Sequence, residues 1–200
     1  MKTVIIAEAG VNHNGSLDLA LKLIDKAKEA GADYVKFQTF NTDLTISKLA
    51  KKASYQAVNT NDQEESQYDM VRKLELSFDD FITLKKHCEK IKIGFLSTGF
   101  DLPSVAFLQK LDIDYFKIPS GDVTNYPLIK AIAQTKKPLI FSTGMTTLGE
   151  IESTLDLLLQ NGASREQITI LHCNTEYPTP MHDVNLKAMN NLGHAFGVKV

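Results

Sequence analysis

Short apolar runs alternate along this chain with longer amphipathic stretches, and this alternation is the strongest constraint on its fold. The runs are bounded by turn residues, as buried strands are, and the stretches between them have helical periodicity. Strands are expected at about 3–9, 33–39, 93–98, 115–118, 138–144 and 168–173, and the opening of a seventh at 196–200. Strands that alternate with helices predict an α/β fold with a parallel sheet.

Six complete strand–helix units and the start of a seventh predict a (β/α)8 TIM barrel, truncated after the start of strand seven, with residues 1–200 as one incomplete barrel domain. A doubly wound sheet is the alternative. No Gly-x-Gly-x-x-Gly sequence follows the first strand, which disfavours the dinucleotide-binding form of that sheet. Because a barrel completes its hydrogen bonding only when all strands are present, we expect the chain to be part of a longer enzyme.

Capping residues indicate where several helices begin. Ser16, Ser77 and Asp101 each precede a stretch of helical periodicity, and their side-chain oxygens can accept hydrogen bonds from the first turn. Helices are expected at about 16–30, 77–90, 147–161 and 185–194, with a shorter one after Asp101. The apolar face of the first helix is expected to consist of Leu19, Leu23, Ile24 and Ala27.

A long polar stretch, from Asn41 to about Glu75, separates the second and third strands. It contains short helical patterns and no convincing strand. A connection of this length inside a domain is usually functional or disordered. We interpret it as a flap over an active site, with disorder as the alternative.

Composition excludes several classes of partner. The formal net charge is −2, so no general attraction to nucleic acid or to membrane surfaces is expected. The two cysteines do not form a Cys-x-x-Cys sequence, which argues against a disulfide scaffold and against a cysteine zinc site. No run has membrane-spanning length, and the N-terminus does not read as a signal peptide. The expectation is a soluble, cytoplasmic protein.

Three of the apolar runs each contain one charged residue near the end: Glu8, Lys36 and Lys117. A buried charge is costly unless it is paired or binds a ligand, and α/β folds bind ligands at the carboxyl ends of their strands. The three side chains therefore predict one pocket for an anionic substrate. The alternative is an internal Lys–Glu ion pair that fixes the strand register, although two lysines exceed what one glutamate neutralises.

Small hydroxyl residues recur at four strand ends: Ser97-Thr98-Gly99, Pro119-Ser120-Gly121, Ser142-Thr143-Gly144 and Asn174-Thr175. Such turns let backbone approach an anion and donate N–H and O–H groups to it, which favours a phosphate pocket over ordinary turns. Glu8 and Asp122 could also exchange protons at this rim. For Asp122, capping of the next helix is an equally good interpretation.

Five motifs together resemble those of the sialic acid synthase family, which comprises N-acetylneuraminate synthase and its legionaminic and pseudaminic acid relatives. They are Glu8-Ala-Gly-Val-Asn-His-Asn-Gly15, Val35-Lys-Phe-Gln-Thr-Phe40, Lys117-Ile-Pro-Ser-Gly121, Ser142-Thr-Gly-Met145 and His172-Cys-Asn-Thr-Glu-Tyr-Pro-Thr-Pro180. The resemblance runs in order from Val4 to about Leu186, and the last motif is highly specific.

The resemblance implies an enzyme that condenses phosphoenolpyruvate with N-acetylmannosamine to give N-acetylneuraminate and phosphate. The same chemistry on a di-N-acetylated deoxyhexose, as in legionaminic or pseudaminic acid synthases, is one alternative. A truncated, non-catalytic barrel that binds a phosphorylated metabolite is another.

The resemblance also assigns roles to particular residues. The residues that would hold phosphoenolpyruvate are Lys36, Thr98, Lys117, Ser120, Ser142 and Thr175, with Gln38 in support. Glu8 and Tyr177 would meet the amino sugar, and Asp122 would lie near the reacting carbons, so that Glu8, Lys36 and Asp122 are the catalytic candidates. The family usually has Glu at position 122 and Pro at position 99, where this chain has Asp and Gly.

The family further implies a divalent metal such as Mn²⁺, which would polarise the sugar aldehyde. Its histidine ligands are expected beyond Val200, and none of the five histidines here matches them. The C-terminal antifreeze-like domain of the family is likewise absent from these residues. A homodimer is expected for the full-length enzyme.

Overall fold

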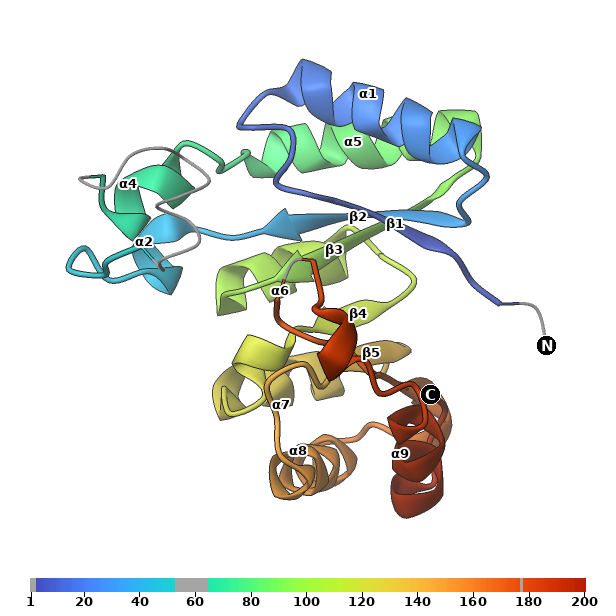
Figure 1. Cartoon of the computed structure of the whole chain (residues 1–200). Coiled ribbons are helices and arrows are strands. Elements are labelled where there is room, and N and C mark those ends of the chain that lie inside the picture. Colours follow the sequence, from blue (N-terminus) through green and yellow to red (C-terminus); the bar gives the residue numbers. More distant parts are fainter. Residues whose placement is uncertain (1–2, 53–64, 177) are drawn as a thin grey trace. The chain divides into compact units, whose positions relative to one another are not determined.

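The expected strands form two parallel sheets in the computed structural model, which describes residues 3–52, 65–176 and 178–200 (Figure 1). The strand order is β1-β2-β3 in an N-terminal unit, Met1–Phe107, and β4-β5-β6 in a C-terminal unit, Leu108–Val200. The α/β class is thereby confirmed. Closure into an eight-stranded barrel stays a prediction, because the strands pair as two sheets of three.

The elements follow the expected order. Those that begin in the N-terminal unit are β1 (Ile6–Gly10), α1 (Leu17–Glu29), β2 (Tyr34–Thr39), α2 (Thr42–Thr45), α4 (Gln67–Arg72), α5 (Phe78–Ile91), β3 (Gly94–Gly99) and α6 (Leu102–Lys110). Those of the C-terminal unit are β4 (Phe116–Ile118), the 3₁₀ helix η1 (Ser120–Asp122), α7 (Tyr126–Gln134), β5 (Leu139–Ser142), α8 (Leu148–Gln160), η2 (Arg165–Gln167), β6 (Ile168–Leu171), η3 (Met181–Asp183) and α9 (Ala188–Phe196).

The predicted caps account for the helix starts. The Ser16 Oγ accepts the Leu19 N–H at 3.3 Å, and Asp101 Oδ1 accepts the Ser104 N–H at 2.7 Å. Ser77 forms a capping box, in which the Asp80 carboxylate accepts the Ser77 N–H while the Ser77 hydroxyl accepts the Asp80 N–H. Each bond satisfies a backbone donor that has no partner within the helix, so local sequence determines these boundaries.

The sheet of the N-terminal unit has two different faces. Val35, Phe37 and Thr39 of β2 are buried, whereas Lys36 and Gln38 between them are half-buried. Figure 1 shows α1 and α5 side by side on one face of β1-β2-β3. Because side chains alternate along a strand, Val35 and Phe37 face the helices, and Lys36 and Gln38 lie on the opposite face of the sheet.

Two expectations about elements are corrected in part. On α1, Leu19 is 41% exposed, because the buried stripe consists of Ala20, Ile24 and Ala27 and places Leu19 at its edge. The expected opening of a seventh strand starts later than Phe196, since α9 continues through that residue and Gly197 caps it in a left-handed conformation. Lys199 then forms a parallel bridge with Thr169 of β6, and its carbonyl accepts the Ile170 N–H at 2.8 Å.

No helix among the described residues combines the length and the apolar character that are needed to cross a bilayer.

The loop between β1 and α1 lies directly against the backbone that follows α4. Gly15 has φ +76°, and a Cβ at this position would overlap the carbonyl oxygen of Lys73. Gly31 has nearly the same φ, +79°, and apart from its chain neighbours no described heavy atom would lie within 4 Å of a Cβ there. Substitutions at Gly15 and Gly31 therefore share the free-energy cost of a positive φ, and only the substitution at Gly15 adds a steric overlap.

Gly15→Ala is expected to destabilise the fold more than Gly31→Ala. The backbone strain costs each variant about 1–2 kcal/mol, and the overlap with Lys73 should add about 1–3 kcal/mol to Gly15→Ala only. Urea unfolding of the two variants and the parent protein measures the difference. Equal losses in the two variants would show that this close approach does not contribute to stability.

Candidate functional site

Glu8 and Lys36 lie opposite each other on neighbouring strands of the N-terminal unit. The parallel register of β1 and β2 pairs these two residues, and Lys36 Nζ forms an ion pair with Glu8 Oε2. The Lys36 side chain is only 13% exposed, whereas that of Glu8 is 51% exposed. The internal ion pair considered from the sequence is therefore present, and its acidic partner remains accessible to a ligand.

Gln38 extends this polar group by one row toward the carboxyl ends of the strands. A Cβ on Gly10 would lie 3.3 Å from Glu8 Oε1 and 3.6 Å from Gln38 Nε2, so the two side chains converge where Gly10 has none. Gln38 also pairs in register with Thr98 of β3, whose side chain is buried. Four of the predicted site residues are thus brought together in this unit.

The two hydroxyls of the third strand end have different environments. Ser97 pairs in register with Phe37, and its hydroxyl shares a 2.7 Å hydrogen bond with Thr39 on the helix-covered side of the sheet. Thr98 is the neighbour of Gln38. Of these two hydroxyls, only that of Thr98 is therefore placed to contact a ligand bound on the face that carries Lys36 and Gln38.

Lys117 is the centre of the corresponding group in the C-terminal unit. Its side chain is buried, and Nζ donates to the Ile118 carbonyl at 2.8 Å and to the Ser142 hydroxyl on the neighbouring strand. Gly144, just beyond β5, packs against Asn174 and Thr175, where a Cβ would lie 3.0 Å from Thr175 Cγ2. The ends of β4, β5 and β6 thereby gather an ammonium group and two hydroxyl side chains.

Asp122 lies on η1, two residues after the half-buried Ser120. It does not cap α7, because Asn125 does: Asn125 Oδ1 accepts the Leu128 N–H, and Asn125 Nδ2 donates to Asp122 Oδ1 at 3.1 Å. Burial raises the pKa of the Asp122 carboxyl, and the Asn125 hydrogen bond opposes that rise. A carboxyl with a raised pKa suits a group that exchanges protons near neutral pH.

The predicted site residues therefore form two groups, one in each unit. Glu8, Lys36, Gln38 and Thr98 make up the first, and Lys117, Ser120, Asp122, Ser142 and Thr175 lie at the strand ends of the second. Tyr177 lies outside the described residues. The prediction of a single anion pocket, and the role given to each residue, stay predictions.

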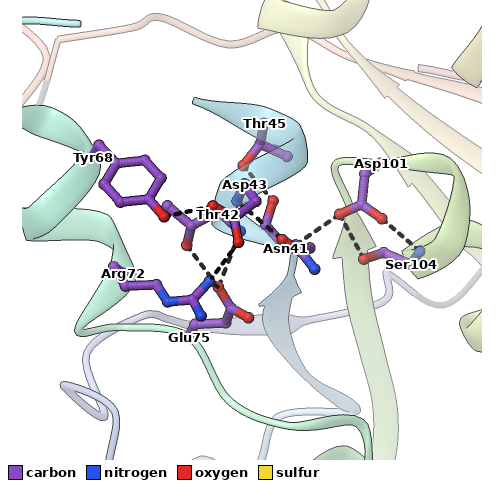
Figure 2. Close-up of polar contacts among 9 residues, drawn as sticks. All are labelled: Asn41, Thr42, Asp43, Thr45, Tyr68, Arg72, Glu75, Asp101 and Ser104. Carbon is purple, nitrogen blue, oxygen red and sulfur yellow. Dashed lines mark hydrogen bonds and ion pairs between the residues drawn. The ribbon is translucent and has the colours of Figure 1, made fainter. Parts of the chain in front are cut away.

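A polar cluster between β2, α2, α4 and α6 was missed by the sequence reasoning (Figure 2). We call it the clasp; it consists of Asn41, Thr42, Asp43, Tyr68, Arg72, Glu75, Asp101 and Ser104. The Glu75 carboxylate accepts the Thr42 N–H at 3.0 Å and the Thr42 hydroxyl at 2.7 Å. Asp101 Oδ2 accepts the Asn41 N–H at 2.8 Å.

Asp43 holds the α4 side of the clasp. The Tyr68 hydroxyl donates to Asp43 Oδ1 at 2.5 Å, and this bond lowers the pKa of Asp43 and raises that of Tyr68. Arg72 Nη1 reaches Asp43 at 3.3 Å and Glu75 at 3.4 Å. The described ends of the polar stretch 41–75 are therefore folded onto the carboxyl ends of the strands, while 53–64 lie outside the described residues, so the flap itself stays a prediction.

A hollow of about 220 Å³ lies under the clasp in the N-terminal unit. It is lined by Gln38, Phe40, Thr45, Ile46, Val71 and Phe100. Phe40 and Phe100 follow the last residues of β2 and β3, and their rings meet edge to face with centroids 6.4 Å apart. The hollow therefore begins where the polar row of Gln38 and Thr98 ends.

The described residues contain no grouping of three or more His, Cys, Asp or Glu side chains that could hold a metal ion. These residues therefore do not fit a metal centre, and no metal ligand is assigned among them. The chemistry that follows uses the side chains of this chain alone.

The chain is similar to known proteins over most of its length. The model of the NeuB family matches residues 23–200. The N,N'-diacetyllegionaminic acid synthase of Campylobacter jejuni is 55% identical over 199 residues, which are 100% of this chain and 59% of the relative. The protein of the same name from Legionella pneumophila is 45% identical over 202 residues, 100% of this chain and 56% of the relative.

A solved structure is also similar, the N-acetylneuraminic acid (sialic acid) synthetase of Leptospira borgpetersenii in complex with citrate. Its TM-score is 0.82 at 31% identity, with 98% of this chain and 63% of that chain covered. The chain thus spans less than two thirds of the length of each of these relatives.

Replacement of Asp122 by Asn tests the environment of this carboxyl. Because the folded-state pKa is raised, the stability that the neutral carboxyl contributes is present below about pH 3.9 and is lost as pH rises through the raised pKa. The amide of the variant does not ionise and can still accept from Asn125. Urea unfolding between pH 4 and 7 should therefore show the variant gaining stability relative to the parent as pH rises. A pH-independent difference would contradict the buried environment.

Proposed function

The chain belongs to the NeuB family, as its motifs predicted, and we propose that the enzyme condenses phosphoenolpyruvate with an N-acetylated amino sugar and releases phosphate. The observation that carries the proposal is the buried Lys117 ammonium, which donates to Ser142 at the carboxyl ends of β4 and β5. A charged donor beside a hydroxyl donor suits an anionic group such as phosphate or carboxylate. In this proposal the six strands are those of a (β/α)8 barrel.

The acceptor in this proposal is a di-N-acetylated deoxyhexose. The resemblance of the motifs implies N-acetylmannosamine as the acceptor. The two curated relatives at 55% and 45% identity, however, are both named for the synthesis of N,N'-diacetyllegionaminic acid, a product with two acetylated nitrogens. Their similarity over the whole chain supports the alternative acceptor.

Binding and orientation in this proposal come from the two lysines. Lys117 and Ser142 donate to one anionic group of phosphoenolpyruvate, with Ser120 and Thr175 as further hydroxyl donors at the same strand ends. Lys36, held by Glu8, supplies a second positive charge, and Thr98 a hydroxyl. Glu8, whose side chain is half exposed and whose Oε1 lies beside Gly10, accepts from a hydroxyl of the sugar. Fixed donors of this kind cost little reorganisation when the substrate binds.

Proton movement in this proposal is assigned to Asp122. The C3 carbon of phosphoenolpyruvate uses its π electrons to bond to the aldehyde carbon, and the protonated carboxyl of Asp122 gives its proton to the resulting alkoxide. The carboxylate then takes a proton from the water that adds at C2. The bond from C2 to the bridging oxygen breaks, the new C2 hydroxyl gives its proton to the departing phosphate, and a ketone remains at C2. The raised pKa of Asp122 suits both halves of this cycle.

The proposal also includes three expectations from the sequence, which concern a metal ion, the oligomeric state and the location of the enzyme. A divalent metal such as Mn²⁺, held by residues outside those described, remains a prediction, and no step above depends on it. A homodimer and a cytoplasmic location are likewise predictions.

Phosphate release from the full-length enzyme in which this chain occurs tests the proposed reaction. With phosphoenolpyruvate that carries ¹⁸O at the bridging position, we expect the label in the released phosphate, because the C–O bond breaks. Release should require an amino sugar acceptor and water. Label retained in the sugar acid would instead show P–O cleavage, and no release with any acceptor would leave a binding protein as the better interpretation.

Lys117→Met should weaken phosphoenolpyruvate binding by about a hundredfold, because it removes a charge-assisted hydrogen bond from a buried site. Equilibrium titration of the full-length enzyme measures the dissociation constant. Lys137→Met is the matched control, since it removes a lysine that pairs with Asp112 away from these strand ends. An unchanged dissociation constant for Lys117→Met would refute the assignment of this lysine.

Asp122→Asn should lower kcat by about a hundredfold or more and change KM for either substrate only a few-fold, if the carboxyl moves a proton. Asp122→Glu, which restores the usual residue of the family, should retain activity. Steady-state kinetics of both variants decides between the roles. Equal losses in substrate binding and turnover would make Asp122 a structural partner of Asn125.

A further inference from the structure

The hollow under the clasp has walls that the proposed reaction does not use. Four of its six lining side chains are apolar: Phe40, Ile46, Val71 and Phe100. Neither phosphoenolpyruvate nor a sugar hydroxyl gains from contact with such walls, because both would lose water there without a compensating hydrogen bond. The lining therefore points to an apolar part of a ligand.

The strands place this hollow beside the proposed site residues. Lys36 and Gln38 are two residues apart on β2, and Phe40 follows two residues later, just after the strand. The three side chains are therefore expected on the same face, and both Gln38 and Phe40 line the hollow. Gln38 belongs both to the polar row over Gly10 and to the lining of the hollow. A ligand that reaches Glu8 and Gln38 can thus extend a substituent past Gln38 toward the Phe40–Phe100 pair.

The bonds of the clasp, which Figure 2 shows, hold the helices that carry the other side of the hollow. The bonds from Thr42 to Glu75 and from Asp43 to Tyr68 and Arg72 hold α2 and α4 together, and Thr45, Ile46 and Val71 of the lining lie on or next to these helices. Thr45 Oγ1 is itself bound, since it donates to the Asn41 carbonyl at 2.9 Å. The hollow is therefore a built feature of the fold, with the Gln38 carboxamide at its edge.

Its size limits what can enter. A cavity of about 150 Å³ can hold one benzene ring, whereas pockets for whole ligands measure about 300–1,000 Å³. At about 220 Å³ the hollow suits one substituent of a larger molecule. An acetamido group matches it, because its methyl is apolar and its amide can both donate to and accept from the carboxamide of Gln38.

We infer that this hollow binds the second acetamido group of a di-N-acetylated acceptor sugar, with Val71 and Phe100 against its methyl and Gln38 on its amide. This inference rests on the proposed function and explains how the enzyme would distinguish two acceptors. Where a di-N-acetylated hexose has an acetamido group, N-acetylmannosamine has a hydroxyl, which would lose its water against these walls.

Val71→Phe tests the inference by filling the hollow in the full-length enzyme. Three acceptors are compared by phosphate release: 2,4-diacetamido-2,4,6-trideoxymannose, 2-acetamido-2,6-dideoxymannose and N-acetylmannosamine. The second has the 6-methyl carbon of the first and lacks its second acetamido group. We expect the ratio of kcat/KM for the first acceptor to that for the second to fall at least tenfold in the variant.

Leu44→Phe is the matched control, because Leu44 lies on α2, is 59% exposed and does not line the hollow; its ratio should equal that of the parent. If Val71→Phe does not fold, Val71→Ala is measured in its place. Loss of two methyl groups from the hollow should lower the ratio of kcat/KM for the first acceptor to that for the second about tenfold. A fall that is equal for the first two acceptors, relative to the third, would assign the hollow to the 6-methyl group and overturn the inference. An unchanged ratio in the folded Val71 variant would overturn it too.

The same assays distinguish a failure of the proposed condensation from a failure of the acetamido subsite. If the parent enzyme releases no phosphate with any of the three acceptors, the condensation itself is refuted and the acetamido subsite with it. If the parent is active and only the Val71 ratio is unchanged, the condensation stands and the subsite alone is refuted.

Discussion

The parallel register of β1 against β2 is the constraint on which the N-terminal unit depends. It sets Glu8 beside Lys36, and the ion pair that forms there satisfies two charges on the face of the sheet that α1 and α5 leave uncovered. A slip of one residue would turn these charges toward the helices and bring Val35 and Phe37 to the polar side. The same strand register therefore buries Val35 and Phe37 against the helices and pairs Glu8 with Lys36 on the other face.

In the C-terminal unit, two neutral oxygens accept hydrogen bonds from the lysine. Lys117 lies among the buried side chains of β4 and β5, and its Nζ donates to the Ile118 carbonyl and the Ser142 hydroxyl. Ammonium groups in an interior need such acceptors, because desolvation otherwise disfavours the charged form. In the first unit the lysine is paired with a carboxylate, whereas in the second these two acceptors are dipoles. An incoming anion would therefore meet one lysine, Lys36, that already pairs with a full negative charge, and another, Lys117, that donates to a hydroxyl and a carbonyl.

Local signals account for what the sequence predicted well. Ser16 and Ser77 act as caps through contacts within three residues, and the apolar runs appear as strands whose ends differ from the expected ones by at most three positions. The departures come from neighbouring residues whose role the pattern did not separate. The strand expected from Phe196 starts later because α9 continues to Gly197, and of the two interpretations of Asp122 the cap is excluded because Asn125 takes that position. The family was recognisable because its motifs are continuous in the sequence.

The clasp could not be predicted in this way. It pairs Thr42 with Glu75 and Asn41 with Asp101, residues that are 33 and 60 positions apart. No periodicity links such positions, and each residue alone reads as an ordinary polar residue of a connection. Opposite charges near the two ends of the stretch, on Asp43 and Arg72, are the only sequence signal that could have suggested a closure.

That closure also changes what the stretch between Thr42 and Glu75 is free to do. Its two ends are joined to each other by hydrogen bonds, so α2 and α4 are held at the strand ends by contacts within the stretch itself. Residues of these helices that take no part in the clasp, such as Val71, can therefore change while the strands and the clasp stay as they are. Relatives with different acceptors would then differ first in these residues.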